Sequence, residues 1–248
     1  MGGNKVEAVR ALFSLELKDS EVAFLFLGYS GILLRTEDLA IAIDPGKSLS
    51  HEEGAAITHL DLILFTHNHW DHYKKDYALE IIQQTGTHVV ADIVTSEELK
   101  AIIPSTRLTK ADPRTKDATY QIGETAVTAL EGIHVGPITQ YLIDLGKIMV
   151  FHGGDSGYWR LKDTSADLAF VPVGTATTCS PATALATIID LSPKIAVPIH
   201  GRRQEMKHFR SIMEKVLPEV EVIIADKFRP IRVPAWSSSD STIEDGIS

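Results

Sequence analysis

A six-residue segment, His67-Asn68-His69-Trp70-Asp71-His72, places three imidazoles and a carboxylate directly after the apolar run Leu62–Phe65. Imidazole nitrogen and carboxylate oxygen are the ligands that zinc and similar divalent cations prefer. Because the side chains of a strand alternate between its two faces, the ligands can meet only if the backbone leaves the strand after Thr66. The pattern therefore predicts a metal-binding loop at a strand end. The alternative is a polar loop in which Asp71 caps a helix and the histidines lie on the surface.

Three further residues of ligand type stand where a predicted strand ends, namely His134, Asp155 and His200. A glycine lies within two residues of each, which is typical of a turn. The ends of buried strands are also where layered α/β folds place their sites. Taken alone, each of the three could be structural. Together with the first motif they predict one site.

This arrangement resembles the metallo-β-lactamase-fold hydrolase superfamily, over roughly residues 22 to 224. The resemblance implies an α/β fold built as a four-layer αββα sandwich, with a dinuclear metal site at one edge. It implies that the first metal is bound by His67, His69 and His134. It further implies that the second is bound by Asp71, His72 and His200, with Asp155 as the bridge between the two.

Such a centre predicts a metal-dependent hydrolase. Two divalent cations supply hydroxide near neutral pH, which would attack an ester, lactone or phosphoester of a small substrate. Asp71 is expected to accept a proton as well as to bind metal. Zinc is the first expectation for the metal, with manganese or iron as alternatives, and Arg160 is a candidate contact for an anionic substrate.

Two other functions stay open. A mononuclear iron sulfur dioxygenase would use a subset of the same ligands. A non-catalytic metal-binding protein is the other class, although seven His and Asp ligands without cysteine are more typical of an open catalytic site than of a closed structural one.

Finer assignments rest on shorter segments. Residues 41–46 resemble the strand and Asp-Pro-Gly element that precedes the metal loop in this superfamily. The stretch from Thr177 to Gly201 resembles the branch that contains ascorbate-6-phosphate lactonase, but Cys179, Ser180 and Ala182 depart from that branch. Substrate specificity therefore cannot be transferred. Asp44 either orients a ligand histidine or accepts backbone amides in a turn, and both interpretations stay open. We expect His152 to have a structural or ligand-orienting role, and Cys179 to be a small buried residue.

Most predicted strands are short continuous apolar runs, which suit strands buried on both faces. The clearest are 22–27, 39–43, 148–151, 168–171 and 220–224, to which the middle of the chain adds 119–122, 126–130 and 140–145. Helical stripes begin at Tyr77, Leu185 and Met206. Alternating strands and helices indicate one layered α/β domain over residues 1–236, with a loose polar tail at 237–248.

Composition and charge indicate which classes of partner to expect. The net charge of −9 argues against a nucleic-acid partner, and we expect the basic cluster Arg202, Arg203, Lys207 and Arg210 to be a solvated helix face. There is neither a long apolar run nor a signal-like first segment, and Cys179 is the single cysteine. We therefore expect no membrane partner and a cytoplasmic location. The oligomeric state cannot be predicted from these patterns.

Overall fold

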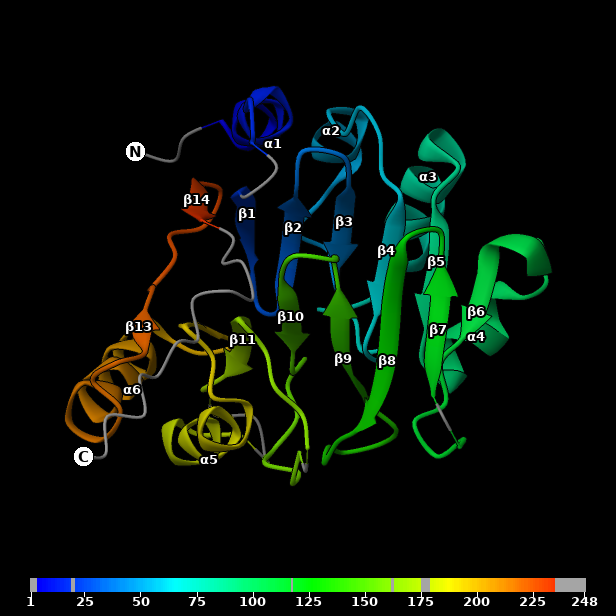
Figure 1. Cartoon of the computed structure of the whole chain (residues 1–248). Coiled ribbons are helices and arrows are strands. Elements are labelled where there is room, and N and C mark those ends of the chain that lie inside the picture. The colour runs from blue at the N-terminus through cyan, green and yellow to red at the C-terminus, as the bar shows by residue number, and fades with distance from the viewer. Residues whose placement is uncertain (1–3, 19–20, 117, 162, 175–178, 235–248) are drawn as a thin grey trace, which may run out of the picture.

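The computed structural model describes residues 4–18, 21–116, 118–161, 163–174 and 179–234. Within them, two seven-stranded sheets face each other and helices cover the outer face of each sheet (Figure 1). The predicted αββα sandwich is confirmed. The predicted polar tail at 237–248 lies outside the described residues.

The first sheet has the spatial order β14-β1-β2-β3-β4-β5-β6. Its strands are antiparallel from β14 to β3 and parallel from β3 to β6. Its strands are β1 (Glu21–Gly28), β2 (Gly31–Arg35), β3 (Ala40–Ile43), β4 (Leu62–Phe65), β5 (His88–Ala91), β6 (Leu108–Lys110) and β14 (Pro230–Pro234). The helices of this half are α1 (Lys5–Ser14), α2 (His51–Ala55), α3 (Lys75–Thr85) and α4 (Ile93–Leu99), with a short 3-10 turn at Ser105–Arg107.

The second sheet has the order β13-β12-β11-β10-β9-β8-β7. It is parallel from β13 to β10 and antiparallel from β10 to β7. Its strands are β7 (Thr119–Ile122), β8 (Thr125–Glu131), β9 (Thr139–Asp144), β10 (Met149–His152), β11 (Leu168–Pro172), β12 (Ile195–Ile199) and β13 (Glu221–Val222). Helices α5 (Pro181–Leu191) and α6 (Arg203–Val216) pack together on its outer side (Figure 1).

The continuous apolar runs are explained by burial on both faces of a sheet. In β1, Phe24 belongs to the core between the sheets, whereas Leu25 belongs to the core under α1 to α4. Leu64 and Phe65 divide in the same way in β4. Full burial of such a side chain contributes about 1.5–3 kcal/mol, so both cores stabilise the strands that carry the site.

Some elements differ from the sequence prediction. Strands β2, β5, β6 and β14 and helices α1, α2 and α4 were not predicted from the sequence. Several of them are very short, such as β6 with three residues and α2 with five, so they carry little periodicity. The strand expected at 220–224 is limited to β13, an edge strand paired only with β12 over two residues. At the end of this strand, the guanidinium of Arg210 donates to the carbonyl of Val222.

No helix among the described residues is long and apolar enough to cross a membrane. The cytoplasmic location stays a prediction.

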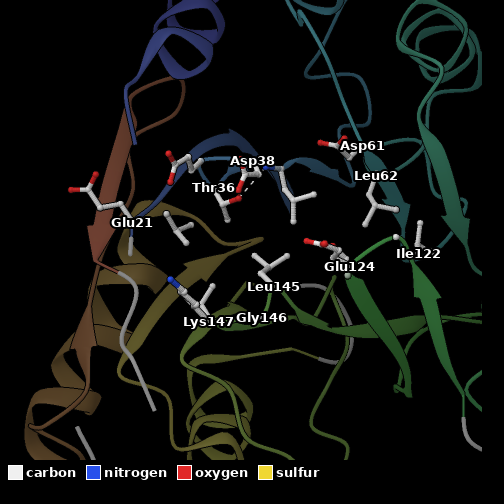
Figure 2. A pocket seen from close by; sticks show the side chains of 16 residues that line it. Glu21, Thr36, Asp38, Asp61, Leu62, Ile122, Glu124, Leu145, Gly146 and Lys147 are labelled. Atoms are coloured by element: carbon white, nitrogen blue, oxygen red, sulfur yellow. Dashed lines mark hydrogen bonds between the residues drawn. The ribbon is translucent and has the colours of Figure 1, made fainter. Parts of the chain in front are cut away.

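The two ends of the sandwich differ in chemistry. At one end, the first residues of β1 and β4 and the β7–β8 and β9–β10 turns surround a hollow of about 610 Å³ (Figure 2). Its described lining includes Glu21, Glu37, Asp38, Asp61 and Glu124, with Lys147 and no histidine. All the predicted metal ligands follow the carboxyl ends of β4, β8, β10 and β12, at the opposite end. This hollow of about 610 Å³ is therefore not the predicted metal site.

Hydrogen bonds between the sheets fix the end of β4, where the predicted metal loop begins. The hydroxyl of Tyr141, in β9, donates to the carbonyl of Phe65 at 2.8 Å. One residue later, the backbone amide of Thr139 donates to the carbonyl of Thr66 at 2.9 Å. The second sheet thus holds the first sheet's strand at the point where the chain must turn away.

We predict that Tyr141→Phe lowers the free energy of unfolding by about 1 kcal/mol, because a buried hydrogen bond is lost while the ring stays packed. Urea denaturation measures this. Tyr120→Phe is the matched control. The hydroxyl of Tyr120 accepts a hydrogen bond from the backbone amide of Asp112, but this bond is only half-buried. An unchanged stability of the Tyr141 variant would show that this bond does not hold the strand end.

Candidate metal centre

The chain leaves β4 at Thr66 and turns tightly through the six-residue motif. The amides of His72 and Tyr73 both donate to the carbonyl of His69, at 2.9 and 2.8 Å. This turn reverses the chain before α3. It gathers side chains that a continuing strand would have sent to opposite faces.

The structure brings all seven predicted side chains together in two adjoining clusters. Within each, the ligand-type atoms lie within 4.8 Å of one another. The first cluster comprises His67, His69, His134 and Asp155, and the second comprises Asp71, His72 and His200. That these groups bind metal stays a prediction, but the spatial grouping matches the expected ligand sets.

Asp155 lies between the clusters. One carboxylate oxygen is 3.5 Å from Nε2 of His67. The other is 3.5 Å from Nε2 of His134, 3.7 Å from Nε2 of His72 and 3.6 Å from Nε2 of His200. This carboxylate therefore reaches histidines of both clusters, which is the position that a bridging ligand requires.

Buried nitrogen atoms test whether divalent cations fit here. Nε2 of His67 and Nε2 of His72 are both buried, and neither has a hydrogen-bond partner among the described residues. A buried polar atom without a partner is costly, so native proteins rarely keep one without a reason. Both atoms lie within 4 Å of Asp155. Cations between these nitrogens and carboxylates would satisfy them, so the donor set fits metal ions.

A buried hydrogen-bond network orients His72. Asp44 Oδ2 lies 2.8 Å from Nδ1 of His72, so this nitrogen carries the proton and Nε2 is left to face the cluster. Thr66 donates to the same carboxylate twice, from its hydroxyl at 2.6 Å and from its amide at 2.8 Å. Asp44 thus fulfils both roles that the sequence left open. Thr66 was not predicted, since a threonine between a strand and a histidine has no distinctive signal.

Crowding and charge set the protonation of the cluster. Burial and the neighbouring imidazoles lower the pKa of His67 far below its usual value, so this ring is neutral. Burial acts the same way on His72, but the Asp44 carboxylate outweighs it and raises the pKa. Burial likewise opposes charge on His200, yet its hydrogen bond to Asp71, with Cys179 and Asp155 nearby, raises its pKa to about 10.

His152 supports the turn that carries Asp155, in agreement with the structural role expected for it. This fully buried ring places Nε2 2.8 Å from the carbonyl of Ser30, and its Nδ1 accepts from the amide of Gly154 at 3.2 Å. The hydroxyl of Ser30 donates back to the carbonyl of Gly154 at 2.7 Å. The β1–β2 turn and the Asp155 turn are therefore fastened to each other across the two sheets.

Other candidate residues have clearer places in the structure. Cys179 is buried, as expected, and its thiol also approaches His200. Arg160 is exposed, and no described contact joins it to the clusters. Two of the four residues expected to form a solvated helix face also line a hollow. Arg202 and Arg203 are exposed but line a hollow of about 430 Å³ that also reaches His200.

Comparison with known proteins agrees with this geometry. A family model described as a beta-lactamase superfamily domain matches residues 23–200. A protein of Thermococcus kodakarensis named as a UPF0173 metal-dependent hydrolase is 31% identical over 189 residues, which are 71% of this chain and 82% of the relative. The lactonase-like branch stays a prediction.

Solved structures share the fold. Igni18, described as a novel metallo hydrolase from Ignicoccus hospitalis, superposes with a TM-score of 0.73 at 20% identity, over 86% of this chain and 99% of its own. The metallo-beta-lactamase fold protein YhfI of Bacillus subtilis has a TM-score of 0.68 at 17% identity, over 86% and 100%. At these identities the likeness concerns the fold alone.

We predict that Asp44→Asn weakens metal binding about 10- to 100-fold, because the carboxylate that orients His72 is lost. Competition with a chromophoric chelator measures the affinity, and circular dichroism checks the fold. Asp38→Asn, an exposed position in the opposite hollow, is the matched control. Equal affinity in the two variants would remove Asp44 from the centre.

Gly46→Ala provides an independent test of how the loop is positioned. Gly46 has a φ of 49°, and a Cβ there would overlap the carbonyl oxygen of Asp71. We predict that the loop carrying His67 to His72 is displaced. Metal affinity should fall at least about tenfold, which is the order seen when a residue that positions a metal ligand is lost. Gly123→Ala has a similar φ of 59° but open space around it, so it shares the backbone cost only. Identical metal affinity in both variants would contradict the prediction.

Proposed function

The chain belongs to the beta-lactamase superfamily and to the UPF0173 family of metal-dependent hydrolases, and we propose that it hydrolyses an ester, lactone or phosphoester of a small substrate at a two-metal centre. One observation carries the proposal. Seven His and Asp side chains converge at one edge of the sandwich, with Asp155 between the two clusters. A closed structural site would use about four ligands, commonly with cysteine.

The proposed ligand sets follow the two clusters. His67, His69 and His134 would hold one ion, Asp71, His72 and His200 would hold the other, and Asp155 would contact both. Divalent ions bound there supply hydroxide at neutral pH and polarise the oxygen of the scissile group. Zinc is the first candidate, with manganese or iron as alternatives, since His and Asp ligands accept all three.

Asp71 is the residue that we propose accepts a proton. Its Oδ2 lies 3.4 Å from Nε2 of His200 and 3.8 Å from Nε2 of His72. Burial acts to raise the pKa of Asp71, but the hydrogen bond to His200 and the charge of His72 outweigh it and lower the pKa. The carboxylate is therefore ionised at neutral pH, and it can take a proton from the attacking water.

Access to this edge supports a small substrate. The hollow of about 430 Å³ beside His200 lies between Tyr29, α6 and the turn that carries Lys227. Its size falls within the range of sites for small molecules, about 300–1,000 Å³. Substrate can therefore approach the second cluster from solvent.

Hydrolysis assays on metal-loaded protein test the proposal, with a lactone, a phosphodiester, a thioester and a simple ester as substrates. We expect two equivalents of metal, turnover of at least one class and loss of turnover after chelation. His200→Asn and Asp71→Asn should each reduce kcat at least about 100-fold, the order of a lost acid–base or metal contact. His208→Asn, at an exposed position on α6, should not.

Two results would refute the proposal. A single tightly held iron with thiol-dependent oxygen uptake would identify a sulfur dioxygenase. Full folding stability without metal, together with no turnover of any class, would identify a non-catalytic metal-binding protein.

A further inference from the structure

Lys47 and Lys227 lie beside the rings of Tyr29 and Trp70, next to the second of the two clusters. The ammonium of Lys47 is 4.0 Å from the Trp70 ring centroid and 5.5 Å from that of Tyr29. The ammonium of Lys227 is also 5.5 Å from the Tyr29 centroid. The two rings meet edge to face at 5.6 Å, and Trp70 belongs to the metal loop itself. The charges are thus held on aromatic faces rather than left free in solvent.

In the described part of the chain, neither Lys47 nor Lys227 forms an ion pair. Among the described residues, no carboxylate lies within the 4.0 Å of an ion pair from either ammonium, whereas nearby Lys5 pairs with Glu53 at 3.8 Å. Lys5, Lys47 and Lys227 line one hollow of about 420 Å³, and its described lining includes no Asp or Glu. Like charges gathered in this way repel each other unless an anion lies between them. In a chain of net charge −9, such a grouping is unexpected on the surface.

The backbone holds this group in a strained conformation. Tyr29 has a φ of 52°, which is costly for a bulky side chain, and the amide of His200 donates to its carbonyl at 2.7 Å. Gly28, with a φ of 111°, leaves room for the stem of Lys227, since a Cβ there would lie 2.9 Å from Cε of that lysine. The β1–β2 turn therefore fixes Tyr29 and admits Lys227 beside it.

The group is continuous with the metal centre. Tyr29 and Lys227 line both the lysine hollow and the hollow that reaches His200. The Tyr29 and His200 ring centroids are 6.4 Å apart. A molecule the size of a phosphorylated or carboxylated metabolite can therefore touch a lysine and the second metal cluster at the same time. The hollow at the opposite end (Figure 2) is lined by five acidic side chains and Lys147, so it is a poor site for an anion.

We propose that Lys47 and Lys227 form an anion-binding subsite, so that the substrate carries a phosphate or carboxylate group beside its scissile bond. The subsite orients that group while the bond lies at the metal cluster. The assignment of a substrate class rests on the proposed hydrolytic function. The binding of an anion to the two lysines can nevertheless be measured without turnover.

The first test is the binding of inorganic phosphate to zinc-loaded protein by isothermal titration calorimetry. We expect Lys47→Gln/Lys227→Gln to weaken phosphate binding at least about tenfold, the order for loss of charge-assisted contacts. The control is Lys116→Gln/Lys215→Gln, which removes two exposed lysines that line none of these hollows. Phosphate held by metal alone would bind the three proteins equally, and that result would overturn the subsite.

A substrate pair separates this inference from the proposed function. Phenyl acetate and phenyl hemisuccinate present the same ester without and with a carboxylate. In the lysine variant, KM for the hemisuccinate should rise about tenfold with kcat nearly unchanged, while phenyl acetate is unaffected. Equal effects on both esters would overturn the subsite even if the protein is a hydrolase. If neither ester is turned over, the phosphate titration alone decides.

Discussion

Four imidazoles packed around one buried carboxylate are the constraint on which the rest of this structure depends. The ring centroid of His67 lies 4.1 Å from that of His72 and 4.8 Å from that of His134. At this spacing, burial and mutual repulsion lower the pKa of both His67 and His134. These two rings are therefore neutral, and a neutral imidazole offers one nitrogen lone pair to a cation. We infer that cations between them stabilise this edge of the fold and supply its chemistry, so that metal binding and folding are linked.

The two-sheet architecture meets this constraint by ending strands of both sheets at the same edge. The predicted metal loop follows β4 of the first sheet, and the other candidate ligands follow β8, β10 and β12 of the second. The cost of turning the chain sharply at this edge is visible in its backbone. Asp44, His200 and Tyr29 have φ values of 45°, 46° and 52°, although none is glycine. Each is held by a hydrogen bond to another segment of the site, which is how strain persists at functional positions.

The apolar runs predicted a layered α/β domain, and the resemblance to the metallo-β-lactamase-fold superfamily implied the αββα sandwich and the candidate ligands. His67 to His72 is a dense motif, and the other ligands each stand at the end of an apolar run. What the sequence could not predict depends on contacts between distant segments. Asp44 could be a turn residue or a partner of His72 until β3 and β4 were seen side by side. Lys47 and Lys227 are 180 positions apart and meet only through Tyr29, so no local pattern marks them.

The most direct test of a two-metal centre is an anomalous-scattering map from crystals grown with zinc. The account predicts two peaks. One should lie among His67, His69, His134 and Asp155, and the other among Asp71, His72, His200 and the same Asp155. A single peak, or zinc bound outside these seven side chains, would contradict it.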